Sequence, residues 1–187
     1  LLLPRKITLL GGKVMGHWAG FCLKVFLSVK IIIKGKENII TDQKFFIAAS
    51  HQSMFETFYL QTVFNSPVFI LKKELLTIPL FGWYLKKIGS ISINRNKISK
   101  DNLGFFEDIL KTVNDNNRQL IIFPQGTRVL PDERPPFKKG AARIYQKLNI
   151  ACQPVAINSG NVWPKKASKK SYKTITISIL TPIKNGL

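Results

Sequence analysis

Residues 45–63 read FFIAASHQSMFETFYLQTV. The run at 45–50 is short and apolar, as in a buried strand, and the pattern from 53 to 63 is that of a helix. His51 stands at the junction between the two, and Glu56 follows five residues later. We therefore expect a strand–turn–helix unit that carries an imidazole at its turn.

The rest of the chain repeats this alternation. Short β-rich runs predict strands at residues 30–35, 45–50, 67–72, 90–94, 119–124, 154–158 and 173–180. Helical patterns occupy residues 53–63, 79–87, 99–113 and 140–148. This rhythm predicts an α/β fold with a mostly parallel twisted sheet flanked by helices. Functional residues of such sheets collect where strands end and helices begin, which points to His51 and to the segment after Pro124.

The N-terminal part of the chain is apolar but does not read as a membrane span. Lys24 and Lys30 interrupt the run at 11–33 before about 20 apolar residues accumulate. At helical spacing an apolar face opposes a narrow polar strip, which suits a helix lying in a bilayer interface. An ordinary amphipathic helix packed on the domain is the alternative. We expect an amphipathic, membrane-associated helical segment at 1–33, followed by one domain at 34–187.

Three glycines in this segment have a regular spacing. Gly12, Gly16 and Gly20 recur every four residues. Each glycine costs a helix about 1 kcal/mol relative to alanine, so the pattern needs a reason. Close packing against another helix is the reason that we expect.

The composition favours anionic partners. The formal net charge is +19 and the isoelectric point is about 10.2. Nucleic acid, an acidic membrane surface, a phosphorylated substrate and an acidic carrier protein all fit such a charge, and a general bias toward lysine is the alternative explanation. The aromatic residues lie in apolar helical runs and do not alternate with Arg or Lys along a strand, which disfavours a nucleic-acid stacking platform. Cys22 and Cys152 lie far apart without zinc-ligand spacing, so no metal site is expected.

Two roles fit Glu56. Ser53-x-x-Glu56 reads as a capping box, in which the carboxylate reaches back to a backbone N–H. Alternatively, Glu56 holds His51 through Nδ1–H and leaves Nε2 free to take a proton. The sequence lacks a GxSxG elbow, an HExxH motif and a phosphate loop ending in GK[ST]. With no evident protein nucleophile, the simplest task for His51 is to act as a base on a substrate hydroxyl.

A second candidate site lies in the segment LIIFPQGTRVLPDERPPFKKGAARIYQ at 120–146. Gly126 and Thr127 allow a tight turn whose N–H groups face an anion, and Arg128 adds a planar fork suited to phosphate. Lys138 and Lys139 precede an expected helix, whose N-terminus also favours negative charge. A solvated basic loop is the alternative.

Two motifs together are specific enough to indicate a family. SHQSMFET at 50–57, followed by FPQGTR at 123–128, resembles the bacterial type of the 1-acylglycerol-3-phosphate acyltransferases of phospholipid synthesis. The triplet INR at 93–95 resembles the family's intermediate Arg-containing motif, and PVAI at 154–157 its last apolar motif. The likeness runs from about residue 34 to the C-terminus. Two positions depart from the family pattern, because Glu56 stands where most members have Asp and Gln125 where they usually have Glu.

The resemblance implies an O-acyltransferase that makes phosphatidate. His51 would deprotonate the sn-2 hydroxyl of a lysophosphatidate, and the oxygen would attack the thioester of acyl-CoA or acyl-carrier protein. Glu56 would orient His51 and stabilise the imidazolium. The acceptor's phosphate would be bound by the following residues: Arg128, Thr127, Gly126, Arg95 and Gln125. Weaker candidates for phosphate or donor contacts are Lys138 and Lys139.

The resemblance also implies the partners and the location. The two substrates and a membrane surface are the expected partners, with no nucleic acid, metal or other cofactor. The expected location is the cytoplasmic face of a bacterial inner membrane. Another lysolipid acceptor is the alternative within this class, and a basic nucleic-acid-binding domain is the alternative outside it.

Overall fold

The computed structural model describes residues 4–65, 67–93, 103–115, 118–166 and 168–186. Within these ranges seven strands form one sheet in the order β1-β7-β6-β2-β5-β3-β4. Their bounds are Lys30–Lys34 (β1), Phe45–Ala49 (β2), Val68–Lys72 (β3), Ile91–Ile93 (β4), Leu120–Ile122 (β5), Ala151–Ile157 (β6) and Thr174–Ile179 (β7). Neighbouring strands are parallel except for the β6–β7 pair. The predicted α/β fold with a mostly parallel sheet is confirmed.

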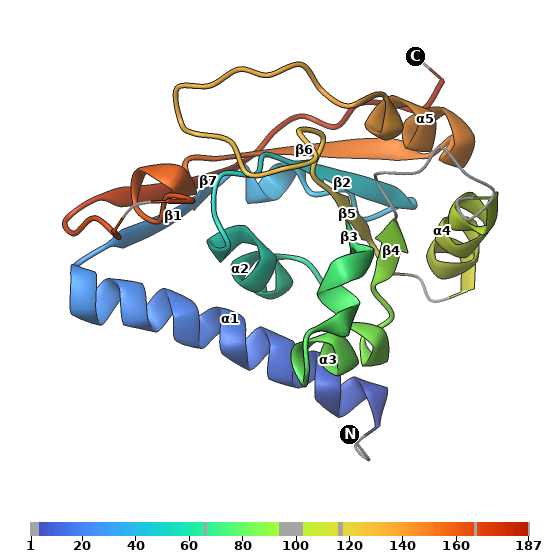
Figure 1. Cartoon of the computed structure of the whole chain (residues 1–187). Helices are drawn as coiled ribbons and strands as arrows, with labels where there is room; N and C mark the ends of the chain where they lie inside the picture. The colour runs from blue at the N-terminus through green and yellow to red at the C-terminus, as the bar shows by residue number, and fades with distance from the viewer. Residues whose placement is uncertain (1–3, 66, 94–102, 116–117, 167, 187) are drawn as a thin grey trace.

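Helices cover both faces of this sheet (Figure 1). The α-helices are α1 (Arg5–Leu27), α2 (Phe55–Val63), α3 (Phe81–Lys87), α4 (Leu103–Asp115) and α5 (Lys139–Leu148). Short 3-10 turns lie at η1 (Lys36–Asn38), η2 (Lys73–Thr77) and η4 (Ser159–Asn161). α1, α2 and α3 lie on one side of the sheet, and α4 and α5 on the other.

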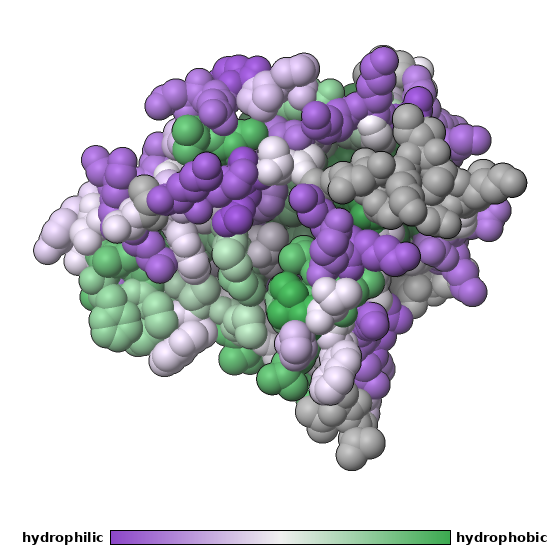
Figure 2. Space-filling model, viewed as in Figure 1, coloured by the Kyte–Doolittle hydropathy of each residue, from purple (hydrophilic) through white to green (hydrophobic). Residues whose placement is uncertain are grey.

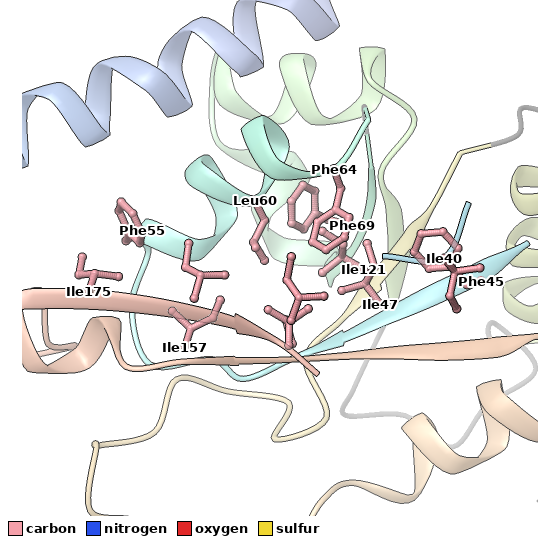
Figure 3. Packing of buried hydrophobic residues seen from close by; sticks show 14 of the residues in the cluster. Ile40, Phe45, Ile47, Phe55, Leu60, Phe64, Phe69, Ile121, Ile157 and Ile175 are labelled. Atoms are coloured by element: carbon pink, nitrogen blue, oxygen red, sulfur yellow. The ribbon is translucent and has the colours of Figure 1, made fainter. Parts of the chain in front are cut away.

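The central strand β2 shows why the sheet is covered on both faces. Its side chains alternate, as in any strand, so Phe45 and Ile47 pack under α2 whereas Phe46 packs under α4 and α5. All three are nearly or fully buried. Figure 3 shows the first of these layers, where Leu60 of α2 points toward the strands of the sheet. A strand that is buried on both faces has apolar side chains at successive positions, which explains the unbroken apolar run of β2.

The N-terminal helix ends earlier than the boundary that we expected at residue 33. Ser28 adopts a left-handed conformation (φ 51°) and closes α1 with a backbone bond to the Leu23 carbonyl oxygen. β1 then begins at Lys30, and Ile31 pairs with Ile175 of β7. The residues 30–33 are therefore part of the sheet, because their isoleucines complete its edge.

The glycine stripe of α1 faces α2, as predicted. Gly12, Gly16 and Gly20 are buried. A Cβ atom added at Gly16 would stand 2.5 Å from the backbone oxygen of Phe58 and 2.7 Å from Cγ2 of Thr62. The two helices therefore approach each other more closely than a side chain at position 16 would allow.

The opposite side of α1 is apolar and exposed. Phe26 is 74% exposed and Trp18 63%, and further exposed apolar residues of this helix are Ile7, Leu10, Val14, Met15, Phe21 and Val25. Figure 2 shows apolar side chains gathered over α1 at the lower left, with hydrophilic side chains directly above them. Among the described residues, we find no helix with the length and apolar character that crossing a bilayer requires.

Alanine at position 16 is expected to destabilise the protein by about 1–3 kcal/mol, because the new methyl group overpacks the contact with α2. Gly11 offers a matched control on the same helix, since a Cβ there would meet nothing within 4 Å. Gly11→Ala should leave stability unchanged or raise it by up to about 1 kcal/mol through helix propensity. Thermal or urea unfolding of both variants measures the difference. Equal stability of the two variants would contradict the close α1–α2 packing.

Candidate active site

The loop that carries His51 joins β2 to α2 at the carboxyl edge of the sheet. Backbone pairing extends one residue beyond β2, because the N–H of Ser50 donates to the carbonyl oxygen of Val155 (2.9 Å). The Ser53 hydroxyl accepts the N–H of Phe55 (3.1 Å), which satisfies one of the free donors at the start of α2. The chain therefore turns between His51 and Glu56, and the helical spacing rule does not apply to this pair.

Glu56 fills both of the roles that the sequence left open. Its side chain is fully buried, and Oε2 lies 3.2 Å from Nδ1 of His51. The same carboxylate accepts the backbone N–H of Gln52 (3.1 Å) and that of Ser53 (3.0 Å to either oxygen). One carboxylate thus serves the helix start and the imidazole together, because its two oxygens are shared between them.

The imidazole of His51 is held from a second side by the FPQGTR segment. Its ring stacks on Phe123 with 4.1 Å between ring centroids. The N–H of Val129 donates to the carbonyl oxygen of His51 (2.9 Å). With Nδ1–H donating to Glu56, Nε2 keeps a lone pair for a substrate proton. The fold therefore brings the two motifs side by side, although they lie far apart in the sequence.

One cavity of about 410 Å³ is shared by the histidine and the predicted phosphate residues. It is lined by His51, Gly126, Thr127 and Arg128. Gly126 has a positive φ of 70°, and its N–H donates to the carbonyl oxygen of Phe123 (2.8 Å), which forms the tight turn that we expected. The arginine and the imidazole thus open onto the same space.

Two lysines of this cavity were not predicted. Lys72 ends β3, and Lys165 lies in the loop after η4, where its Nζ stands 3.5 Å from Oγ1 of Thr127. The position of Lys72 at the carboxyl end of a predicted strand was a usable signal. Lys165 had none, because it is one of several lysines in a loop between two strands.

The rest of the cavity wall is apolar. It is built by α2, β3, η2 and α3 with the residue that follows α3, and includes Phe58, Phe69, Leu75, Phe81, Leu85 and Ile88. The hydroxyl of Tyr84 donates to Oε1 of Gln61 (3.2 Å) within the same lining. The cavity therefore has a cationic part near His51 and a larger apolar part along the helices.

Gln125 does not join this group. It lines a second cavity of about 660 Å³, together with Gln52 and Ser50. Gln52 and Gln125 therefore open onto a different cavity from the one that His51 lines. The expectation that Gln125 contacts the phosphate is therefore not supported by its position.

Two further predicted residues, Lys138 and Lys139, lie at the start of α5. The backbone N–H of Lys138 donates to the carbonyl oxygen of Pro124 (2.8 Å), which fixes the start of α5. The side chains of Lys138 and Lys139 are exposed and do not line the cavity of His51. Arg95 lies outside the described residues.

The cysteines do not contribute a nucleophile to this site. Cys152 is buried in β6 among the side chains under α4 and α5. Burial raises the pKa of its thiol to about 11, so the thiol is neutral at physiological pH. Cys22 belongs to α1, and neither residue lines the cavity of His51.

Comparison with known proteins finds several relatives that carry the same name. The 1-acyl-sn-glycerol-3-phosphate acyltransferase of Pseudomonas aeruginosa is 31% identical over 172 residues, which cover 89% of this chain and 65% of that protein. The protein of the same name from Helicobacter pylori is 36% identical over 142 residues, covering 73% of this chain and 59% of the relative. The chain thus spans about three-fifths of the length of these relatives.

A solved structure shares the fold. The crystal structure of the 1-acyl-sn-glycerophosphate acyltransferase PlsC from Thermotoga maritima superposes with a TM-score of 0.74 at 24% identity. The match covers 96% of this chain and 70% of that one. The family model described as Acyltransferase matches residues 30–158, which include His51, Glu56 and Arg128. The chain therefore belongs to the Acyltransferase family.

Proposed function

We propose that this protein transfers a fatty acyl group from a thioester donor to the sn-2 hydroxyl of 1-acylglycerol-3-phosphate, which gives phosphatidate. One observation carries the proposal: a histidine backed by a buried carboxylate shares its cavity with an arginine and with a long apolar wall. A lysophosphatidate has the matching parts, namely a hydroxyl, a phosphate and an acyl chain. The names of the relatives support this choice of substrate.

His51 acts as the general base in this reaction. Nε2 takes the proton of the acceptor hydroxyl, and the oxygen attacks the thioester carbonyl. The tetrahedral intermediate then collapses, the carbon–sulfur bond breaks, and the leaving thiolate takes the proton back from His51. Glu56 stabilises the imidazolium between these two steps. Such a base contributes about 10²–10⁴-fold, so positioning of the substrates must supply much of the remaining rate enhancement.

Arg128 is the main phosphate ligand in this proposal, with the Gly126–Thr127 turn, Lys72 and Lys165 beside it. A guanidinium and ammonium groups around one cavity favour a dianionic phosphate over a neutral headgroup. The apolar wall along α3 takes the acyl chain.

Arg128→Gln is expected to raise the KM for 1-acylglycerol-3-phosphate by about 10–100-fold, because charge-assisted hydrogen bonds to the phosphate are lost. The matched control is Arg143→Gln, an exposed arginine on α5 outside the cavity. The KM for 1-acylglycerol, which has no phosphate, should change little in either variant. If Arg128→Gln impaired both acceptors equally, Arg128 would not be a phosphate ligand.

The exposed apolar side of α1 is proposed to lie in a membrane interface. Trp18, Phe21 and Phe26 supply the apolar surface that enters the interface, and the exposed Lys24 on the same helix is available to anionic headgroups. The net charge of +19 adds a long-range attraction to acidic lipids. The cytoplasmic face of a bacterial inner membrane, where acyl thioesters are made, is the proposed location.

The activity is tested by supplying 1-acylglycerol-3-phosphate with either palmitoyl-CoA or palmitoyl-acyl-carrier protein and following thiol release. Release should require the acceptor, and mass spectrometry should find phosphatidate as the product. The ratio of the two rates identifies the donor. Salt-dependent binding of single-stranded RNA without any thiol release would instead favour the nucleic-acid-binding alternative.

A further inference from the structure

Ser159 is a buried serine that contacts the carboxylate of the proposed catalytic pair. It begins η4, directly after β6, and its side chain is fully buried. Its hydroxyl donates a hydrogen bond to Oε1 of Glu56, a residue 103 positions earlier in the chain. Ser159 does not line the cavity of His51, so it is placed to act on the carboxylate and not on a substrate.

The hydrogen bonds to Glu56 divide between its two oxygens. Oε1 accepts the N–H of Gln52, that of Ser53 and the hydroxyl of Ser159. Oε2 accepts the N–H of Ser53 and lies 3.2 Å from Nδ1 of His51. The other donors to Glu56 are backbone groups. Among side chains, Ser159 contacts Oε1 and His51 contacts Oε2. A carboxylate held at one oxygen cannot rotate freely, so the other oxygen stays directed at the imidazole.

The turn that carries Ser159 is fixed to the His51 loop at two more points. The N–H of Gly160 donates to Oε1 of Gln52 (3.1 Å). The Ser50 hydroxyl donates to the carbonyl oxygen of Ile157 (3.1 Å) and accepts the N–H of the same residue (2.7 Å). These hydrogen bonds fix the Ser159 turn relative to the loop that carries His51. The Ser159 hydroxyl is therefore held in a fixed position beside the Glu56 carboxylate.

We propose that Ser159 is a positioning residue for the acyl transfer. Its hydroxyl fixes the orientation of the Glu56 carboxylate, and the carboxylate in turn holds His51 in the Nδ1–H tautomer, which keeps Nε2 free for the acceptor proton. This inference rests on the proposed function for its role in the reaction. The Ser159–Glu56–His51 arrangement itself can be tested without a substrate.

The kinetic test replaces Ser159 by alanine. The value of kcat should fall by about 10–100-fold, as expected for loss of a hydrogen bond to a charged group, with little change in KM. In a Glu56→Gln background the same substitution should lower kcat almost no further, because the effects of substitutions at residues that act through one another do not add. Ser159→Cys keeps a weaker donor of similar size and should give an intermediate kcat.

Ser50→Ala is the matched control. This serine also makes hydrogen bonds at the β2–β6 junction, but it has no contact with Glu56. Its loss should lower stability, while its effect on kcat should be independent of the residue at position 56. If Ser159→Ala and Ser50→Ala behaved alike in both backgrounds, Ser159 would be only a structural residue.

The substrate-independent test is the ¹⁵N NMR signature of the histidine rings, which distinguishes the two tautomers. His17, the only other histidine of the chain, serves as the internal reference. His51 should be in the Nδ1–H form in the wild type and a mixture of forms in Ser159→Ala. An unchanged tautomer together with unchanged kcat would overturn the inference and leave the proposed function standing. If the wild type released no thiol from any donor, the proposed function would fail, and the NMR result alone would decide the role of Ser159.

Discussion

His51→Ala is expected to lower kcat for phosphatidate formation by about 10²–10⁴-fold, the usual contribution of a general base. The reason is that Arg128, Lys72 and Lys165, the other basic side chains among the described residues that line the cavity, are hydrogen-bond donors and do not accept a proton. The KM for lysophosphatidate should change by less than about 3-fold, because the phosphate contacts remain. Thiol release and product mass spectrometry give both constants.

His17→Ala is the control for this change. His17 lies on α1, away from the cavity of His51, and should retain wild-type kcat. Thermal unfolding should show that the His51 variant is folded, since Glu56 keeps its backbone N–H donors. A His51→Ala protein that is folded and turns over at the normal rate would rule out this residue as the base.

Glu56→Gln is expected to lower kcat by a comparable amount, about 10²–10⁴-fold, although it preserves the size of the side chain. The amide can offer only one oxygen. That oxygen must take the place of Oε1, because Gln52, Ser53 and Ser159 all present donors there. The NH₂ group then faces Nδ1 of His51 and, being a donor, selects the tautomer with the proton on Nε2. In that tautomer Nε2 already carries a proton, so His51 cannot take the proton of the acceptor hydroxyl.

Glu37→Gln makes the same chemical change at an exposed position of η1 and serves as the control. It should leave kcat unaltered. The ¹⁵N NMR spectrum of Glu56→Gln should show His51 with the proton on Nε2. Near-normal turnover in Glu56→Gln would mean that the carboxylate caps α2 and has no part in the reaction.

Much of the fold follows from local sequence patterns. The run at 45–49 is continuously apolar because β2 is buried on both faces, and the same holds for the run that forms β5. The helix predicted over 53–63 is α2, and Ser53 just before it accepts the N–H of its first residue, Phe55. Such features depend on residues that are close in the sequence, so the local sequence is enough to predict them.

Two features of the sheet depend on residues distant in sequence. β6 begins at Ala151, three residues before Pro154, although proline usually marks the start or the edge of a strand. Pro154 is accommodated because it contributes its carbonyl oxygen, which accepts the N–H of Leu180 (3.0 Å). β7 runs antiparallel to β6, since among the described residues between them only the short 3-10 turn η4 is helical and no α-helix returns the chain to the same end of the sheet.

The residues of the candidate site that belong to a contiguous sequence motif could be predicted. His51, Glu56 and the Gly126–Arg128 turn follow from their local pattern, and the resemblance to a family joined them. That Gln125 lines a different cavity from His51 could not be predicted, because the sequence does not show the direction in which each residue of a turn points. Lys165 could not be selected from a chain with 29 basic residues, and only folding brings Ser159 to Glu56.

The central claim is that His51 and Arg128 act on one acceptor molecule. The most direct measurement is a crystal structure of the protein with 1-acylglycerol-3-phosphate in the absence of an acyl donor. We expect the sn-2 oxygen within about 2.6–3.2 Å of Nε2 of His51, with the phosphate against Arg128. A phosphate bound instead in the cavity of Gln125, or an sn-2 hydroxyl directed away from the imidazole, would contradict the account.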